Sequence, residues 1–210
     1  MANQVLAGTV MRIIRDPWIS KVRFTLGEFS IFDWQYERVA MAIARGKITC
    51  EVGVKPNREL RSGLATECRY DPETRQLQFP DEQYGSSSGR QRFSIVHEAT
   101  HASFDIQYGN GEGKEFLAID DEAAAWLAQS VYMRSSPYFW DGPIVPGDPI
   151  ELALMLADKI MAVPNYRDQG SPPYSVPPAD TIALKQSVAK IYSFEGGAAG
   201  IKHVYHGLRP

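Results

Sequence analysis

The sequence has few cysteines, no basic surplus and no long apolar run, and each absence excludes a class of protein. Two cysteines in 210 residues, Cys50 and Cys68, are too few for a disulfide scaffold. They are compatible with a reducing compartment, and we expect two buried thiols rather than a disulfide. The net charge of −3 at pH 7 lacks the surplus that holds nucleic acid, and no apolar segment reaches membrane-spanning length. We therefore expect neither nucleic acid nor a membrane as a partner.

The remaining composition is that of an ordinary globular protein. Hydrophobic residues make up 44% of the chain and charged residues 22%. A chain of this length can bury a sizeable core, and we predict a single domain over residues 1–210. Residues 1–20 lack the uninterrupted apolar core of a signal peptide, so the cytoplasm is the default compartment. A protein exported without a cleavable signal would have the same features.

Alternating apolar residues predict a small, mostly antiparallel sheet within residues 1–80. Residues 48–54 have apolar side chains at every second position, which is typical of a strand with one buried face. Residues 64–79 continue this alternation on both sides of a turn signal and therefore predict a hairpin. Two earlier segments, residues 5–14 and 22–31, are expected to add strands.

Helical periodicity predicts further helices, most of them in the second half of the chain. The expected helices cover residues 33–45, 91–107, 120–134, 149–162 and 180–192. A proline-rich connection separates the last two, and a glycine-rich tail over residues 196–210 ends the sequence. The predicted fold class is α+β, in which the sheet precedes metal-site helices at 90–134 and a helical C-terminal part at 148–193.

One segment carries a metal-binding pattern, because His97-Glu98-Ala99-Thr100-His101 spells H-E-x-x-H within a predicted helix. Two histidines four positions apart project from one face of a helix, close enough to hold one metal ion. Glu98 can act as general base toward a water in the open metal position. The pattern predicts the helical half of a zinc site. Its alternative is a helix that places two histidines four apart by chance.

A catalytic zinc site normally takes three protein ligands, so a third must come from elsewhere in the chain. The acids Asp120, Asp121 and Glu122 begin the next predicted helix, which can return beside the first and carry a carboxylate to the metal. Glu122 is favoured because its side chain is longer and because the small Ala125 on the same face permits close helix packing. Asp121 is the alternative, although acids also favour the first turn of a helix without any metal.

With a glutamate on the following helix, this motif resembles the gluzincin branch of zinc metallopeptidases, of which thermolysin is the familiar member. The segment His-Glu-Ala-Thr-His-Ala-Ser-Phe-Asp is similar to the thermolysin-type active-site helix, and the resemblance covers about residues 93–130. It implies a compact zincin-like domain that hydrolyses peptide bonds, with His97, His101 and Glu122 as ligands of Zn²⁺. It also implies that Glu98 activates the zinc-bound water and that the substrate is a peptide or protein.

Two departures from the gluzincin pattern concern the surroundings of the metal. Trp126 stands where that family has an aspartate that supports the first histidine, so we expect Asp105 or Asp121 to supply this support. The donor for the oxyanion of the transition state is also not evident. The candidates near the end of the chain are His203, Tyr205 and His206. Against them, a histidine in a glycine-rich terminal segment is usually solvated.

Two other families that use H-E-x-x-H fit less well. A metzincin would need glycine at position 104 and histidine at position 107, where this chain has Phe104 and Gln107. Peptide deformylase has a cysteine ligand in a Glu-Gly-Cys-type segment, and Glu67-Cys68-Arg69 lacks the glycine. Cys68 is therefore disfavoured as a metal ligand.

The sequence leaves three functions open. The first is a zinc peptidase in which an edge strand within residues 64–79 holds an extended peptide across the metal. The second is a catalytically inactive or regulatory metal-binding module on a zincin scaffold, for which the missing aspartate at Trp126 argues. The third is an exported toxin protease, which would share the chemistry of the first. An inhibitor or immunity partner cannot be read from the chain.

Overall fold

The computed structural model describes residues 3–53, 68–109, 113–164, 166, 172–193 and 202–207. Within these residues the helices are α1 (Gln4–Ile14), α2 (Asp33–Ala44), α3 (Gly89–Tyr108), α4 (Ala118–Ser135), α5 (Pro149–Met161) and α6 (Pro178–Ser193), with a short 3-10 helix at Pro17–Lys21. The strands are β1 (Phe24–Leu26), β2 (Phe29–Ile31), β3 (Thr49–Val52), β4 (Arg69–Asp71), β5 (Gln76–Phe79), β6 (Lys114–Leu117), β7 (Tyr174–Ser175) and β8 (Lys202–Tyr205). This mixture of helices and small sheets confirms the predicted α+β class.

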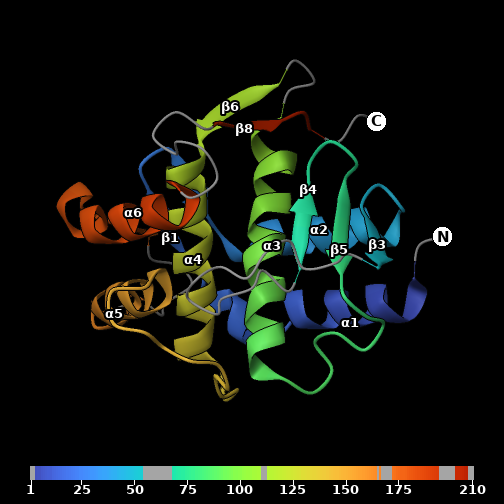
Figure 1. The fold of residues 1–210 in the computed structure, drawn as a ribbon, viewed down its shortest axis with the longest axis horizontal. Coiled ribbons are helices and arrows are strands. Elements are labelled where there is room, and N and C mark those ends of the chain that lie inside the picture. Colours follow the sequence, from blue (N-terminus) through green and yellow to red (C-terminus); the bar gives the residue numbers. More distant parts are fainter. Residues whose placement is uncertain are drawn as a thin grey trace.

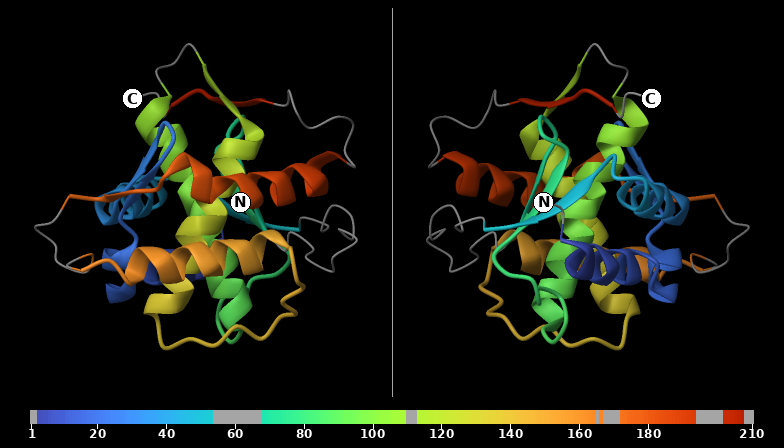
Figure 2. Two further views of the ribbon diagram at one scale, coloured as in Figure 1. Left: turned by 90° about the vertical axis from the view of Figure 1, so that its left-hand side faces the viewer. Right: turned by 90° about the vertical axis from the view of Figure 1, so that its right-hand side faces the viewer.

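Two neighbouring helices, α3 and α4, form the centre of the molecule (Figure 1). On one side α5 and α6 cover α4, and on the opposite side α1 and α2 pack against α3 (Figure 2). Buried alanines line both central helices, among them Ala99 and Ala102 on α3 and Ala124 and Ala125 on α4. Such small side chains let two helices approach closely, which brings the longer polar side chains of α3 and α4 within reach of one another.

Local signals explain where the central helices begin. The Ser88 side chain accepts a hydrogen bond from the backbone N–H of Gln91 and thereby caps α3. Helix α4 starts directly after β6 and carries Asp120 and Asp121 in its first turn, where negative charge stabilises the helix dipole. The five predicted helices are confirmed, with ends that differ from the expected ones by no more than two residues.

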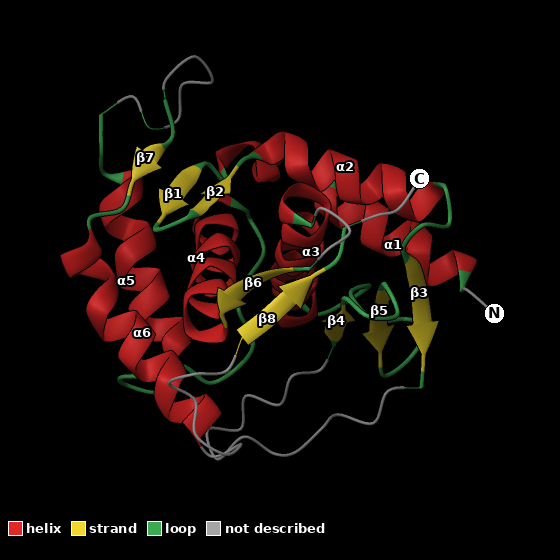
Figure 3. Cartoon of the chain, turned by 90° about the horizontal axis from the view of Figure 1, so that it is seen from above, coloured by secondary structure: helices red, strands yellow, loops and turns green. Residues whose placement is uncertain are grey.

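The strands form three small sheets instead of the single sheet that was expected. Their orders are β2-β1-β7, β3-β5-β4 and β6-β8. The segment 22–31 is confirmed as β1 and β2, joined at Gly27, whose positive φ suits glycine. The described part of the 64–79 hairpin is also confirmed, because β4 and β5 are antiparallel with Tyr70 opposite Leu77. Figure 3 shows β6 and β8 crossing over one end of α3 and α4, with β4 beside α3.

One predicted strand is wrong, because residues 5–14 belong to helix α1. The buried Leu6, Val10 and Ile13 recur at helical spacing and form one face against the core. The side chain of Asn3 caps this helix by accepting a hydrogen bond from the backbone N–H of Leu6. The β-branched residues of the segment favour a strand, but the buried helical stripe and the cap outweigh that preference.

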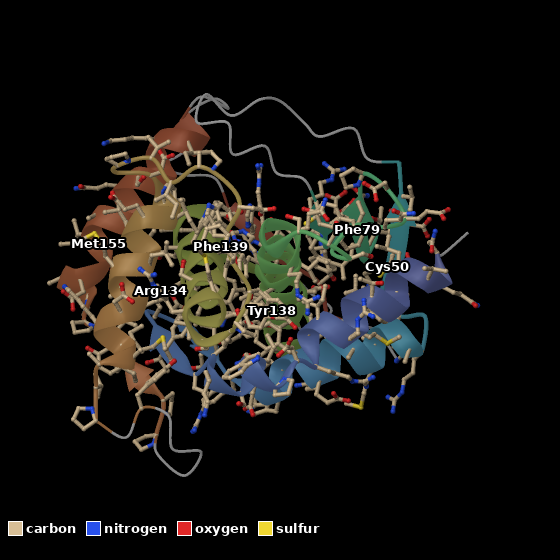
Figure 4. The ribbon with its side chains drawn as sticks, turned by 90° about the horizontal axis from the view of Figure 1, so that it is seen from below. Cys50, Phe79, Arg134, Tyr138, Phe139 and Met155 are labelled. Carbon is tan, nitrogen blue, oxygen red and sulfur yellow. The ribbon has the colours of Figure 1, made fainter. Side chains whose placement is uncertain are left out.

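Three further observations concern one end of the molecule, its cysteines and its helices. The end opposite β6 and β8 carries Arg134, Tyr138 and the exposed Phe139 (Figure 4). Cys50 and Cys68 are both buried and are not joined in a disulfide, as expected. Of the helices in the described ranges, none combines the length and the apolar character that crossing a membrane requires.

Candidate metal centre

The structure brings the three predicted ligands together between α3 and α4. Nε2 of His97 lies 3.2 Å from Oε2 of Glu122, and Nε2 of His101 lies 3.5 Å from Oε1 of the same carboxylate. All three residues are buried, and their ligand atoms lie within 4.8 Å of one another. The four-residue spacing on α3 puts both imidazoles on one side of the helix, and the first turns of α4 supply the carboxylate.

The three acids at the start of α4 have different surroundings. Asp120 forms an ion pair with Lys185 of α6, with 2.9 Å between Oδ1 and Nζ. Asp121 is 0% exposed, and its Oδ1 accepts a hydrogen bond from Nδ1 of His101 at 2.9 Å. Glu122 is the acid whose oxygens lie beside the Nε2 atoms. Geometry thus distinguishes the three acids. Glu122 faces the Nε2 atoms of both histidines, Asp121 supports His101 and shares a second group of possible ligands with His203, and Asp120 is paired elsewhere.

The donor set fits a zinc ion. Two imidazole nitrogens and one carboxylate are ligands that zinc accepts, and three protein ligands leave a fourth position open. The Nδ1–H of His101 donates a hydrogen bond to the carboxylate of Asp121, as the second ring nitrogen of a metal-bound imidazole usually does. His97 differs, because its buried Nδ1 has no hydrogen-bond partner among the described residues. The ring of Trp126 packs edge-on against His97 instead, with the ring centroids 5.0 Å apart.

Asp121 is also the centre of a second cluster, which includes residues from the end of the chain. The hydroxyl of Tyr205 donates to Oδ2 of Asp121 at 2.6 Å, and Nδ1 of His203 is hydrogen-bonded to the same oxygen. Both residues lie on β8, which pairs with β6, and β6 leads directly into α4. Strand pairing therefore carries two of the three C-terminal candidates to the metal centre.

The charges in this cluster stabilise one another despite their burial. Burial would raise the pKa of Glu122, but the imidazoles of His101 and His97 outweigh it and hold the pKa at about 2. Burial likewise opposes charge on His101, but the carboxylates of Asp121 and Glu122 raise its pKa to about 10. Burial would raise the pKa of Asp121 as well, yet His101 and His203 lower it. The candidate centre is thus a buried ion-pair network in which His101 carries a proton at neutral pH.

Glu98, the expected general base, is buried on α3 and is held by the neighbouring sheet. The backbone N–H of Tyr70 on β4 donates to Oε2 of Glu98 at 2.6 Å, and the Tyr70 hydroxyl donates to Asp105 at 2.7 Å. Burial raises the pKa of Glu98, against the opposing effect of His97 and His101. Sequence reasoning did not single out Tyr70, whose one signal was its place in the alternating pattern of the predicted hairpin.

The expected peptide-holding edge is only partly described. β4 is an edge strand, as the order β3-β5-β4 shows, but it covers only Arg69–Asp71. Residues 64–67, the remainder of the predicted first strand, lie outside the described residues. Within β4, the N–H of Tyr70 is already bonded to Glu98 and is not available to a peptide in this arrangement.

Three other candidates lie apart from the ligand group. Asp105 accepts hydrogen bonds from the Tyr70 hydroxyl and from the backbone N–H of Gly207, whereas Asp121 is bonded to His101. The expectation that one of these two acids supports the first histidine, His97, is therefore wrong for both. His206 packs near Gly113 and belongs to neither cluster of possible ligands in the described chain. Cys68 is a buried thiol and is likewise in neither cluster.

Comparison with known proteins gives no match. No protein-family model matches the chain, and no curated protein and no solved structure matches it either. The functional argument therefore rests on the side chains of the metal centre.

Proposed function

We propose that this protein is a zinc-dependent peptidase in which His97, His101 and Glu122 bind the metal and Glu98 is the general base. One observation carries the proposal: the Nε2 atoms of both histidines face the two oxygens of Glu122 in a buried group. This group has the donor chemistry of a catalytic zinc site. When bound, zinc would lower the pKa of a water molecule and polarise the carbonyl oxygen of the substrate.

Glu98 performs the proton transfers in the proposed reaction. Its carboxylate takes a proton from the attacking water, whose oxygen bonds to the peptide carbonyl carbon. The same proton then passes to the nitrogen of the leaving amine as the C–N bond breaks, and the carboxylate is regenerated. Tyr70 holds Oε2 of Glu98, so we assign the water to Oε1. The raised pKa of Glu98 suits a group that must both accept and return a proton.

Of the C-terminal candidates, His203 is the one that we retain as the donor to the oxyanion. Its side chain is 31% exposed, and its ring centroid lies 6.1 Å from that of His101. Its Nδ1 is bonded to Asp121, so Nε2 is the nitrogen assigned to the substrate. Burial opposes charge on His203, but Asp121 outweighs it and raises the pKa, which favours a cationic donor. Tyr205 is 1% exposed and is not retained for this role.

The substrate that we propose is a peptide or protein held in extended form beside β4, through main-chain groups other than the N–H of Tyr70, which is bonded to Glu98. The support for this class is the position of β4, which borders the sheet and contacts Glu98. The buried thiols Cys50 and Cys68, which form no disulfide, are compatible with the reducing cytoplasm, where we propose that the protein acts.

A second candidate function is a metal-binding module that cleaves nothing. The hydrogen bond from Tyr70 to Glu98 favours it, because this bond engages an oxygen of the base with a main-chain donor at 2.6 Å. A buried carboxylate that fastens a strand to a helix has a structural role even without turnover.

Glu98→Gln separates the two functions. Glutamine keeps the size of the side chain and can still accept the hydrogen bond from Tyr70, but it cannot take a proton. We expect turnover of a broad peptide library, followed by mass spectrometry, to fall by at least about 100-fold. Zinc content, measured by atomic emission, should remain at one per chain. The control is Glu37→Gln on α2, which removes an exposed glutamate that pairs with Arg15 and should leave turnover unchanged.

Each outcome of this experiment bears differently on the two proposed functions. Undiminished turnover in Glu98→Gln would refute the role of Glu98. Stoichiometric zinc in the wild-type protein, without cleavage of any peptide, would favour the metal-binding module. A wild-type protein that takes up no zinc would contradict both functions.

A further inference from the structure

Asp121 is a fully buried carboxylate whose hydrogen bonds come from two distant parts of the chain. Oδ1 accepts from Nδ1 of His101 on α3, and Oδ2 accepts from the hydroxyl of Tyr205 and from His203 on β8. A buried charge without such donors would be strongly destabilising. The donors therefore fix the position of this carboxylate, which is adjacent in sequence to the proposed ligand Glu122.

The ring of Tyr205 is enclosed by the core, and its hydroxyl points toward Asp121. The ring packs beside Phe104 and Phe116, with centroid distances of 6.3 and 6.1 Å, and the residue is 1% exposed. The hydroxyl lies 2.6 Å from Oδ2 of Asp121 and 3.3 Å from Nδ1 of His101. A side chain so enclosed is not able to touch a substrate. Its effect on the proposed metal centre passes through these two polar contacts, of which the one with Asp121 is the shorter.

The hydrogen bond between Tyr205 and Asp121 bears on which ring nitrogen of His101 carries the proton. A histidine that binds a metal through Nε2 must carry its proton on Nδ1, and an acceptor at Nδ1 fixes that arrangement and the orientation of the ring. Asp121 supplies the acceptor for His101, whereas Nδ1 of His97 has none among the described residues. Among the described residues, an acceptor at Nδ1 therefore orients the ring of His101 but not that of His97.

We propose that Tyr205 is a positioning residue of the metal centre, which acts by holding Asp121 against Nδ1 of His101. The inference rests on the proposed zinc site. It makes β8 part of that site, although β8 contributes none of the three proposed ligands. The β6–β8 pairing, with Lys114 opposite Tyr205, is what brings the hydroxyl to the start of α4.

Tyr205→Phe in the full chain tests the proposal, because it keeps the ring and removes only the hydroxyl. We expect zinc affinity, measured by competition with a chromophoric chelator, to fall about 10-fold. This is the lower end of the cost of losing an outer hydrogen-bond partner, because Tyr205 bonds to Asp121, which in turn bonds to the proposed ligand His101. The visible spectrum of the Co²⁺-substituted protein should change as well, because it reports on ligand orientation. A purely structural role would leave that spectrum as it is in the wild type.

Tyr132→Phe is the matched control. Tyr132 is another buried tyrosine of the core, and its hydroxyl donates to the carboxylate of Asp16 at 3.3 Å. It lies ten residues after Glu122 on α4, about 15 Å along the helix. The control therefore loses a buried hydroxyl bonded to a carboxylate, but far from the metal. We expect wild-type zinc affinity and a wild-type Co²⁺ spectrum.

A double-mutant cycle with Asp121→Asn tests whether Tyr205 acts through Asp121. If it does, adding Tyr205→Phe to Asp121→Asn should lower zinc affinity no further, because the two changes interrupt one contact chain. Additive losses would overturn the proposal, and so would wild-type affinity and spectrum in Tyr205→Phe alone. If Asp121→Asn does not fold, the single variant still decides. Zinc binding that is insensitive to His97→Ala would instead refute the proposed metal site itself.

Discussion

Zinc binding should release a proton from His101, because the metal-free centre holds this imidazole in its charged form. Burial opposes that charge, but Asp121 and Glu122 raise the pKa of His101 to about 10. A histidine must be neutral to bind a metal, so the ion has to displace the proton. Below the pKa, each displaced proton makes the apparent affinity rise about tenfold per pH unit, or about 100-fold over two units.

Two assays check this prediction. Competition with a chelator of known pH dependence, from about pH 6.5 to 8.5, gives the slope of log affinity against pH, which should be at least one. Calorimetry in two buffers with different ionisation enthalpies counts the protons released at pH 7. His206→Ala serves as the control, because His206 is in neither cluster of possible ligands and its loss should not change the slope. Zinc binding with a flat pH dependence and no proton release would refute the reasoning.

The same pKa shifts predict how the stability of the metal-free protein depends on pH. For His101 the folded pKa of about 10 lies above the ordinary histidine value of 6.5, so its stabilisation is complete below pH 6.5 and is lost as the pH rises toward 10. For Glu122 the folded pKa of about 2 lies below 4.5, so its stabilisation is present above pH 4.5 and is lost as the pH falls toward 2. The melting temperature, measured in the presence of a chelator, should therefore be highest between about pH 4.5 and pH 6.5. A melting temperature that stays constant up to pH 10 would contradict the prediction.

Two further predictions concern buried residues of the hydrophobic core. Phe104→Ala removes a fully buried ring that packs on Phe29 with the ring centroids 4.5 Å apart, and the free energy of unfolding measured in urea should fall by about 3 to 5 kcal/mol. The control Phe139→Ala, at a residue that is 81% exposed, should change this free energy by less than about 0.5 kcal/mol. Equal losses in the two variants would contradict the packing of Phe104. Burial raises the pKa of the Cys50 thiol to about 12, so a thiol reagent at pH 8 should label it slowly in the native protein and rapidly in urea, whereas rapid native labelling would show that the thiol is accessible.

The central helices could be predicted because their signals are local. Ser88 caps α3, His97 and His101 follow at helical spacing, and buried alanines recur along both α3 and α4. The position of Glu122 close to His97 and His101 could also be anticipated. A helix that follows α3 in the chain and packs antiparallel beside it brings its own first turns close to the end of α3. Each of these inferences depends on residues that are neighbours along one helix or on two consecutive helices.

The first helix could not be recognised in the same way. The segment that contains Leu6, Val10 and Ile13 is short and rich in β-branched residues, and such runs fit a strand or a helix about equally well. What decides is tertiary contact, because α1 packs its apolar face on α2 and α3. Similarly, the strands β1 to β5 divide between two sheets, and the partner of β1 in one of them, β7, comes from a remote part of the chain.

The two neighbouring acids Asp121 and Glu122 show why a choice between them at the sequence level was incomplete. Successive residues of an α-helix point about 100° apart, so only one of two adjacent side chains can face the Nε2 atoms across α3. The other points toward Nδ1 of His101 and toward β8, where Tyr205 and His203 meet it. Both acids therefore serve one imidazole, one on each of its nitrogens. The sequence does not reveal this division, because it depends on a strand pairing between β6 and β8 across most of the C-terminal half of the chain.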